Sequence, residues 1–372
     1  MICASLAACG DKADVPRYAA TLVRDPTPGS PQAEVQAAVE EAAADAGYIS
    51  RVYIAADDTE EALKDVFKQV SDDKIKLAVA YGEDMEIPVF NAQKSHRKIK
   101  YVLIDGVPRK SEGEEEEIRD NTMSVSIACE DMGFLAGYAA VKNGSRNLAF
   151  IAGARDDANL RYAGGFVQGC MAAASELSLG NDAVKVTGVY SGSNDLTPLR
   201  MSDALDLYSD GAEIIFAVGE NIGTAVGRAA SVKNMPFISG GADLRETNAT
   251  CLFSVVPSYD GAVKAAVRDF EGDKTFRGGE KVSYGIADDS VELAIDYSDV
   301  TVLTQGDIDA VVAKIKAGEI AISSEEITAG SAQVKLELID PPSAKAAGSA
   351  QSAGGESGVA AENVPSDESV AE

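Results

Sequence analysis

Several residue types on which function often depends are scarce in this 372-residue chain. It has no Trp and a single His, His96, and its five Cys occur without a CxxC or HExxH spacing. These absences disfavour zinc sites and Cys/His catalysis. Its hydrophobic runs all fall short of the roughly 18–20 residues that cross a bilayer, so we expect no membrane-spanning helix.

Basic residues are also in short supply. There are 33 Lys and Arg against 60 Asp and Glu, which gives a formal charge of −27. Such a chain repels phosphate backbones unless it gathers a local basic face, and the sequence reveals none. The most basic stretch, Gln93–Lys100, is typical of a solvated helix end. We therefore expect no nucleic-acid partner, and no metal or other cofactor.

Residues 1–9 look like the end of a bacterial lipoprotein signal. Leu6-Ala-Ala-Cys9 places small residues before a Cys, the pattern at which such signals are cleaved and the Cys is acylated. The charged part and most of the apolar part of a signal are missing, and a chance LxxC in an Ala-rich segment is the alternative. With residues 10–17 as a polar tether, we expect an anchor at Cys9 that holds the protein on the extracytoplasmic face of the cell membrane.

The other end of the chain, residues 341–372, is rich in Ala, Ser, Gly and Glu, and its largest aliphatic side chain is Val. Such a segment buries too little apolar surface to offset the entropy lost on ordering. We expect a disordered acidic tail.

Between the ends, short β-rich runs alternate with amphipathic helical patterns such as Gln32–Ala46 and Thr197–Tyr208. Runs of Val, Ile and Leu bounded by Gly, Asp and Asn predict parallel sheets covered by helices on both faces. The predicted strands are Tyr18–Val23, Arg51–Ala55, Leu77–Ala80, Tyr101–Ile104, Asn147–Ile151, Lys185–Tyr190, Ile214–Val218, Phe237–Ser239 and Thr250–Val255.

Eight or nine such units exceed one comfortable open sheet, so we expect two doubly wound α/β lobes. The break falls near Asn121–Ala128, before a predicted helix at Glu130–Lys142. The first lobe is predicted over 18–127 with a return segment at about 250–275. The second lobe is predicted over 128–249 with a return segment at about 276–330.

Polar residues follow many of the predicted strands. In open parallel sheets a ligand binds beyond the carboxyl ends of the strands. Carboxylates gathered there suit the hydroxyl or amine groups of a small polar solute and repel a phosphorylated one. Asp at a strand end is also an ordinary turn or N-cap residue, and that reading stays open. The residues at these positions are Asp25, Asp105, Asn194, Asp195, Gly219 and Asp243.

The sequence lacks the usual motifs of catalysis. There is no GxSxG, no GxxxxGK[ST], and no GxGxxG after a strand. Two of the strand-end carboxylates acting as acid and base remain a possible enzyme site. No motif supports that reading, and we expect a binding protein.

Several segments, in order, resemble the basic membrane protein family, the substrate-binding lipoproteins of ABC importers that include purine nucleoside receptors. They cover most of residues 18–295, and the Gly-Phe-Leu-Ala-Gly and Gly-Ala-Glu-Ile-Ile-Phe segments are the most specific. The resemblance implies a type I periplasmic-binding-protein fold with two lobes joined by hinge crossings. The segments are 101–106, 121–126, 130–140, 148–153, 165–169, 190–195, 204–216 with Gly219, 241–243 and 253–256.

Departures from the family pattern concern the ligand. The nucleoside receptors carry an Asp-x-Gly-Gly-x-x-Asp-x-Ser-Phe-Asn type motif, in which the aromatic ring stacks on the base. If Ser30 matches the motif's Ser, Pro31 replaces the Phe and Gln32 the Asn. Asn194 replaces a second aromatic, and Pro257 replaces a ribose-contacting Lys.

What survives of that pattern is Asp105, Gly219 and Asp243, with Asp25 as a further candidate. In the nucleoside receptors the equivalents of Asp105 and Asp243 serve the base and the sugar. Tyr81, Tyr162 and Tyr259 lie near predicted crevice edges and could replace the missing rings, or they could be core or surface residues.

We therefore expect a lipid-anchored solute-binding protein that delivers a small polar solute, such as a nucleoside, to an ABC transporter permease. Closure of the two lobes about the hinge would trap the solute. The alternatives are a ligand-sensing receptor module of the same fold and a two-domain α/β enzyme. The predicted ligand-binding residues are Asp25, Ser30, Gln32, Asp105, Asn194, Asp195, Gly219 and Asp243.

Overall fold

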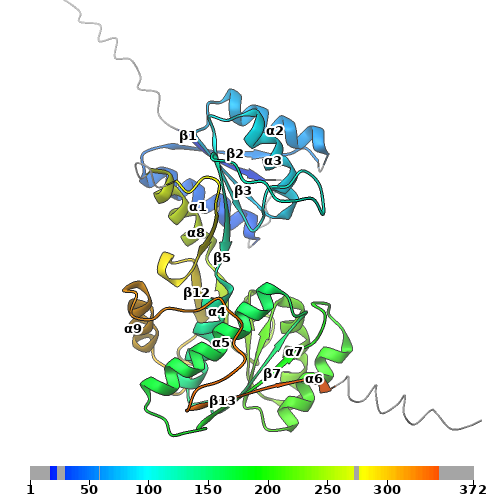
Figure 1. Cartoon of the computed structure of the whole chain (residues 1–372), viewed down its shortest axis with the longest axis vertical. Helices are drawn as coiled ribbons and strands as arrows, with labels where there is room; N and C mark the ends of the chain where they lie inside the picture. Colours follow the sequence, from blue (N-terminus) through cyan, green and yellow to red (C-terminus); the bar gives the residue numbers. More distant parts are fainter. Residues whose placement is uncertain (1–16, 23–29, 58, 272–275, 343–372) are drawn as a thin grey trace, which may run out of the picture.

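The computed structural model describes residues 17–22, 30–57, 59–271 and 276–342, and two lobes follow one another along its long axis (Figure 1). In the described residues the first lobe has a six-stranded sheet of order β11-β5-β4-β3-β1-β2. The second has a seven-stranded sheet of order β12-β10-β9-β8-β6-β7-β13. All neighbouring strands run parallel except the antiparallel pair β10 and β12.

Helices cover both faces of the first sheet, as the alternating pattern predicts. Helix α2 is an example of how the sequence favours such a covering helix. Thr59 caps its first turn, and its buried residues recur at helical spacing: Leu63, Val66, Phe67 and Val70. The elements of this lobe are β1 (Arg17–Leu22), α1 (Pro31–Asp45), β2 (Ile49–Ile54), α2 (Glu60–Asp72), β3 (Leu77–Tyr81), α3 (Glu86–Ser95), β4 (Lys100–Ile104), β5 (Thr122–Ile127), α8 (Tyr259–Glu271) and β11 (Lys281–Tyr284).

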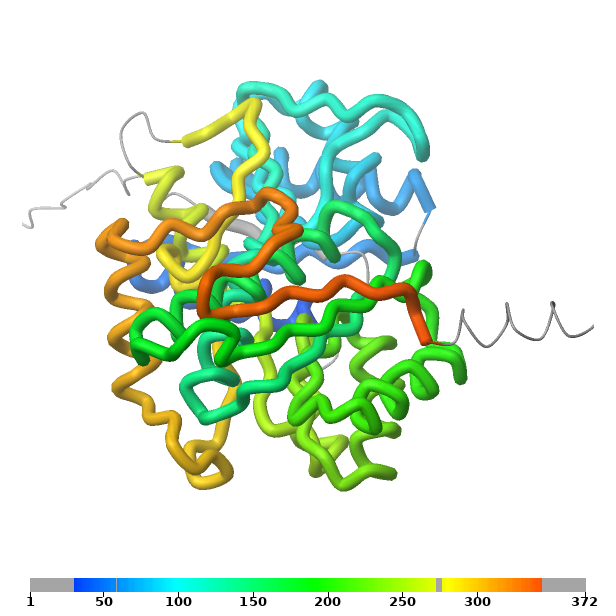
Figure 2. Tube along the Cα trace, turned by 60° about the horizontal axis from the view of Figure 1, so that its bottom comes forward, coloured from blue at the N-terminus to red at the C-terminus, as the bar shows by residue number. Residues whose placement is uncertain are grey.

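The second lobe repeats this architecture on a larger sheet. Figure 2 shows its last strand, β13 (Val334–Ile339), lying alongside β7, with which it pairs in parallel. The other elements are α4 (Cys129–Lys142), β6 (Asn147–Ala152), α5 (Asp157–Glu176), β7 (Val184–Tyr190), α6 (Pro198–Ser209), β8 (Ile214–Val218), α7 (Glu220–Lys233), β9 (Phe237–Gly240), β10 (Cys251–Pro257), β12 (Val291–Ile295) and α9 (Gln305–Lys316).

All nine predicted strands are present within one or two residues of their expected bounds. Strands β5, β11, β12 and β13 were not among them. Strand β5 is largely buried, but Thr122, Ser124 and Ser126 interrupt its apolar residues. β11 and β12 are four and five residues long and lie at or near the hinge, and β13 is an edge strand only partly buried. Short, half-exposed strands carry too few apolar residues to be read from hydrophobic pattern alone.

Within the described residues, three chain crossings join the lobes, at 127–129, 257–259 and 284–291. The return to the first lobe therefore begins after Pro257 and not at about 250, because β10 pairs with β9 in the second sheet. It ends at Tyr284 and not at about 275, because β11 pairs with β5.

The first and third crossings are bonded to each other at the start of α4. The Ala128 amide donates to the Tyr284 carbonyl at 2.8 Å. The Ile286 amide donates to the Asp131 carboxylate at 2.7 Å. Burial raises the pKa of Asp131 to about 6.

Helices α4 and α5 pack unusually closely because glycines face each other between them. A Cβ on Gly133 or Gly137 would lie 2.0–2.1 Å from a backbone carbonyl oxygen of α5, and one on Gly165 or Gly169 would lie 2.0 Å from one of α4. Only glycine permits this approach. The Gly-Phe-Leu-Ala-Gly segment, so specific in sequence, is thus a packing motif of the second lobe.

Candidate functional site

The two sheets turn their carboxyl edges toward each other. Strand β5 runs into the first crossing and β10 into the second, so the parallel neighbours of each strand end on the side of the hinge. Residues that follow β3 and β4 in the first lobe therefore face residues that follow β6, β7, β8 and β9 in the second. This edge-to-edge crevice is where open parallel sheets bind ligands.

On the first lobe, Asp105 is the centre of a hydrogen-bonded cluster. The Tyr259 hydroxyl donates to its carboxylate at 3.0 Å and lies 3.2 Å from the Tyr81 hydroxyl. The two tyrosine rings meet edge to face, with centroids 5.1 Å apart. The cluster thus unites the ends of β3 and β4 with the second crossing, and offers a carboxylate beside two aromatic rings.

Asp105 is held in an unusual backbone conformation and an apolar setting. Its φ of 52° lies in the left-handed region, which Asp and Asn tolerate better than most residues. Its amide donates to the Val125 carbonyl at 2.8 Å, which fixes the turn. Burial raises the pKa of the Asp105 carboxyl, and the hydrogen bond from Tyr259 partly offsets that rise. The carboxylate is therefore poorly solvated and suited to accept further donors.

On the second lobe a pocket of about 290 Å³ opens at the ends of β6, β7 and β8. Predicted residues Asn194 and Gly219 line it, and so does Tyr162, one of the three tyrosines that could replace a missing ring. The remaining lining residues are Asp156, Ala158, Asn159, Val218, Glu220, Asn221 and Ile222.

The side-chain oxygen of Asn194 is already used in hydrogen bonds within the protein, so this residue mainly shapes the pocket wall. Its Oδ1 accepts from the Ala154 amide at 3.1 Å and from Asn159 Nδ2 at 3.0 Å. A Cβ on Gly153 would lie 1.6 Å from that oxygen, so the side chain lies directly over Gly153. The Gly219 amide is likewise already hydrogen-bonded within the protein, because it donates to the Gly240 carbonyl at 3.0 Å.

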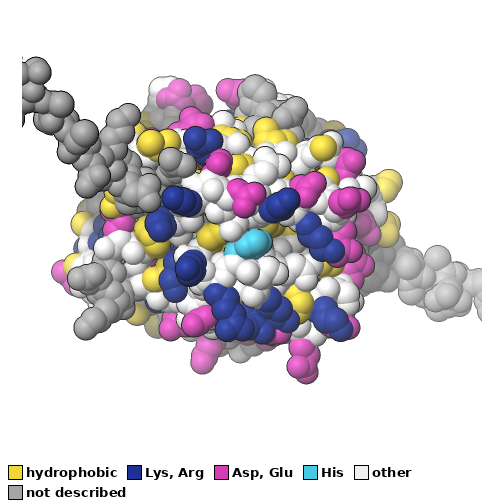
Figure 3. Space-filling view, turned by 90° about the horizontal axis from the view of Figure 1, so that it is seen from above, with side chains coloured by type: hydrophobic (Ala, Val, Ile, Leu, Met, Phe, Trp, Pro, Cys, Tyr) yellow, Lys and Arg dark blue, Asp and Glu magenta, His cyan; other side chains and the backbone are white. Residues whose placement is uncertain are grey.

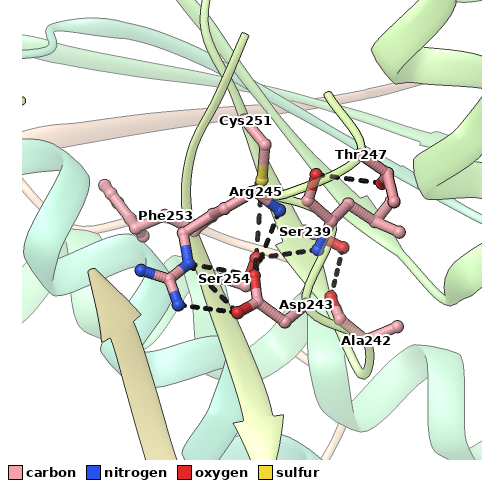
Figure 4. Close-up of polar contacts among 9 residues, drawn as sticks. Ser239, Ala242, Asp243, Arg245, Thr247, Cys251, Phe253 and Ser254 are labelled. Carbon is pink, nitrogen blue, oxygen red and sulfur yellow. Dashed lines mark hydrogen bonds and ion pairs between the residues drawn. The ribbon is translucent and has the colours of Figure 1, made fainter. Parts of the chain in front are cut away.

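Asp243 lies beyond the end of β9 and is engaged by the protein itself (Figure 4). Arg245 donates from Nε to Oδ1 at 2.9 Å and from Nη2 to Oδ2 at 2.6 Å, and its amide donates to Oδ1 at 3.1 Å. Ser254 Oγ donates to Oδ1 at 2.9 Å. The hydrogen bonds from Arg245 hold the pKa of Asp243 below its usual range. Sequence analysis missed Arg245, since nothing in its spacing marks it.

The other predicted residues are distributed as follows. Asp195 accepts a hydrogen bond from Ser193 Oγ at 2.7 Å within its own exposed loop and is not among the pocket residues. Ser30 caps α1, its Oγ accepting from the Ala33 amide at 3.2 Å, and Gln32 lies in the first turn of that helix. Asp25 and Cys9 lie outside the described residues, as does the tail beyond residue 342.

A larger cavity, about 470 Å³, lies between α2 and α3 on the outside of the first lobe, with Leu63, Phe67 and Pro88 in its wall. Its wall consists of residues of α2, of α3 and of the positions next to α3, and it includes none of the predicted ligand-binding residues, so we do not assign it to the crevice.

Across the described ranges, no three His, Cys, Asp or Glu side chains cluster as a metal site would require. In the same ranges, none of the helices combines the length and the apolar character needed to cross a bilayer.

Curated proteins show partial similarity to the chain. Basic membrane protein D of Borreliella burgdorferi (strain JD1) is 24% identical over 212 residues, 56% of this chain and 59% of that protein. The ABC transporter nucleoside-binding protein BmpA of Lactococcus lactis subsp. cremoris (strain MG1363) is 24% identical over 241 residues, 59% of this chain and 64% of that protein. The chain thus spans about three fifths of the length of these relatives.

Solved structures share the fold. An ABC transporter solute-binding protein from Conexibacter woesei DSM 14684 superposes with a TM-score of 0.59 at 18% identity, covering 83% of this chain and 99% of that one. The fold is that of type I periplasmic binding proteins, as predicted. A model of the family described as "ABC transporter substrate-binding protein PnrA-like" matches residues 29–326. The chain therefore belongs to this family of ABC transporter substrate-binding proteins, which is a family of binding proteins and not of enzymes.

Proposed function

We propose that this protein captures a nucleoside or a closely related heterocyclic solute and delivers it to an ABC importer permease, while an acylated Cys9 holds it on the extracytoplasmic face of the membrane. The observation that carries the proposal is the Asp105–Tyr259–Tyr81 cluster, which turns toward the Asn194 and Gly219 pocket on the other lobe.

The chemistry of this cluster suits a planar ring that carries N–H donors. A carboxylate accepts such donors, and hydrogen bonds to a charged group contribute about 1.5–3 kcal/mol each. Aromatic contacts add about 0.5–1.5 kcal/mol beyond their buried area. Tyr81, which is only partly buried, thereby takes over the stacking role that Pro31 cannot fill, and the buried Tyr259 ring supports it edge to face.

The two half-sites lie on different lobes, so each contacts the solute fully only when the lobes close. A ligand that bonds to Asp105 on one side and to the 290 Å³ pocket on the other favours the closed form by its differential affinity. The three crossings supply the hinge. The Lactococcus relative, a nucleoside-binding protein, supports the nucleoside class. Asp25, Ser30, Gln32, Asp195 and Asp243 remain proposed contacts.

A ligand screen on the full chain tests the proposal, with Cys9→Ser added to prevent acylation. Thermal shifts are measured with nucleosides, nucleobases, sugars and amino acids. A ligand at 100 times its Kd adds about 2.7 kcal/mol of stability, which raises Tm by several degrees. We expect such a shift with a nucleoside or nucleobase, and recovery of that ligand unaltered.

Variant Tyr259→Phe then ties the binding to the cluster, because it removes only the hydroxyl that bridges Asp105 and Tyr81. We expect it to weaken the binding of the best ligand about tenfold. Tyr208→Phe is the matched control: its hydroxyl donates to the Pro236 carbonyl at 2.9 Å, away from the crevice. Shifts with sugars or amino acids alone, or equal affinities in both variants, would contradict the proposal.

A further inference from the structure

The outer end of the first lobe carries a group of basic side chains that the linear sequence did not reveal. Lys74 and Lys76 precede β3, Arg97 and Lys98 precede β4, and all four are exposed. We call these four residues the basic edge. Figure 3 views this end of the molecule, with Lys and Arg side chains around the single His. The expectation that no local basic face exists is therefore wrong: two loops whose basic residues are 21 to 24 positions apart in sequence are brought together by the β3–β4 pairing.

Ion pairs within the described part of the chain do not neutralise the charge of these four cations. None of them makes an ion pair with another residue that the structure describes, although the chain carries 60 acidic residues. Neighbouring cations are engaged: Lys94 pairs with Glu117 at 3.0 Å, and Arg119 pairs with the same carboxylate group at 2.7 Å. The basic edge thus presents unpaired positive charge on a strongly acidic protein.

The basic edge lies where the described chain begins. Strand β1 starts at Arg17, and its next residue, Tyr18, is in register with Leu77 of β3, which is in register with Lys100 of β4. The Lys100 amide donates to the Lys76 carbonyl at 2.9 Å. Arg17, the first described residue, therefore lies beside the basic edge.

We propose that the basic edge lies against the anionic phospholipid headgroups of the membrane and orients the receptor upon it. The inference rests on the proposed anchor at Cys9. Eight residue steps from Cys9 to Arg17 span at most about 29 Å, so an acylated chain holds this end of the first lobe near the bilayer. The crevice, at the opposite edge of the same sheet, then faces away from the lipid.

Charge complementarity supplies the contact, and its range is short. The Debye length is about 10 Å at 0.1 M salt, so the four cations act only when the edge is close to the headgroups. Each basic residue near an anionic leaflet favours the docked orientation about fivefold. The acidic remainder of the molecule repels the same surface, which disfavours other orientations.

Lysine footprinting tests the orientation. The full chain with an N-terminal hexahistidine tag is tethered to vesicles that contain nickel-chelating lipid in phosphatidylcholine, with or without 30% phosphatidylglycerol. The rates at which an amine-reactive acetylating reagent modifies Lys74, Lys76 and Lys98 are then measured by mass spectrometry. We expect them to fall about fivefold or more with phosphatidylglycerol, and to recover in 0.5 M NaCl. Exposed Lys335 on the second lobe should not change.

A matched pair of charge reversals completes the test. Arg97→Glu with Lys98→Glu should abolish the protection at Lys74 and Lys76. Arg228→Glu with Lys233→Glu, which makes the same change on α7 of the second lobe, should leave it intact. Equal labelling on both kinds of vesicle, or equal loss in both variants, would overturn the proposal. The tag makes this result independent of acylation, which flotation of the untagged chain with cell membranes reports separately.

Discussion

Replacing Asp105 by Asn isolates the role of its charge. Asn keeps an acceptor oxygen and, like Asp, tolerates the φ of 52° at this position, whereas Ala would add backbone strain. In the proposed ligand complex the change replaces a charge-assisted hydrogen bond to Asp105 by a neutral one, a loss of about 1.5 kcal/mol. We expect the Kd of the best ligand from the screen to rise about tenfold.

The same variant should not lose stability without ligand. Burial raises the pKa of Asp105, so the folded protein is destabilised at pH 7 by having to hold the ionised carboxylate. The stability that a raised carboxyl pKa contributes is present at low pH and is lost as pH rises through the folded-state value. At pH 7, therefore, Asp105→Asn should leave the ligand-free Tm unchanged or slightly higher.

Isothermal titration calorimetry at pH 7 gives the affinity, and differential scanning calorimetry of the ligand-free protein gives Tm. Asp182→Asn is the matched control, because Asp182 is exposed, has the same φ of 52°, and precedes β7 at the edge remote from the crevice. A Kd within twofold of the unmodified protein, or a ligand-free Tm that falls by several degrees, would refute the reasoning.

Three further predictions concern the hinge, the helix packing and the second lobe. The Asp131 pKa of about 6 means that its ionisation opposes folding by up to about 3 kcal/mol above pH 6. Asp131→Asn should therefore gain stability relative to the unmodified protein as pH rises from 4 to 7; a constant difference in Tm across that range would contradict this. Gly137→Ala should destabilise the fold by about 3 kcal/mol or more, because its Cβ would overlap the backbone of α5. Gly180→Ala should not destabilise the fold, because its Cβ would meet nothing within 4 Å. Similar chemical-denaturation midpoints for the Gly137 and Gly180 variants would contradict the packing argument. Arg245→Gln should free the Asp243 carboxylate and raise its pKa, which an NMR titration measures. It should also increase the ratio of the affinity for a nucleoside to the affinity for its nucleobase, by up to about tenfold. An unchanged affinity ratio would leave Asp243 without a role in sugar recognition.

The sequence by itself determined the architecture, because buried strands and amphipathic helices leave a strong periodic signal. The nine predicted strands and the start of α4 lie within one or two residues of their observed bounds. The glycines of α4 and α5 were also visible as a family-like motif. Their role in helix packing could not be predicted, since the close approach of two helices is a property of the pair and not of either segment.

The candidate site could be predicted only in part, because contacts between distant segments are not visible in either segment alone. Asp105, Asn194 and Gly219 could be placed at a crevice edge because the ends of parallel strands share one side of a sheet. The donor to Asp105 comes from a segment far away in the chain, because Tyr259 lies 154 residues from it. Arg245, which donates to Asp243, lies only two residues from it, but nothing in the sequence marks the turn that brings the two side chains together.

The charge distribution illustrates the limit most clearly. A net charge of −27 is a sum over the chain and hides a local excess of the opposite sign. Strand order alone placed Lys74 and Lys76 beside Arg97 and Lys98, next to the point where the described chain begins. Composition and periodicity thus determined which elements form. Tertiary structure decided which side chains meet, because pairing across a sheet joins residues that spacing along the chain cannot relate.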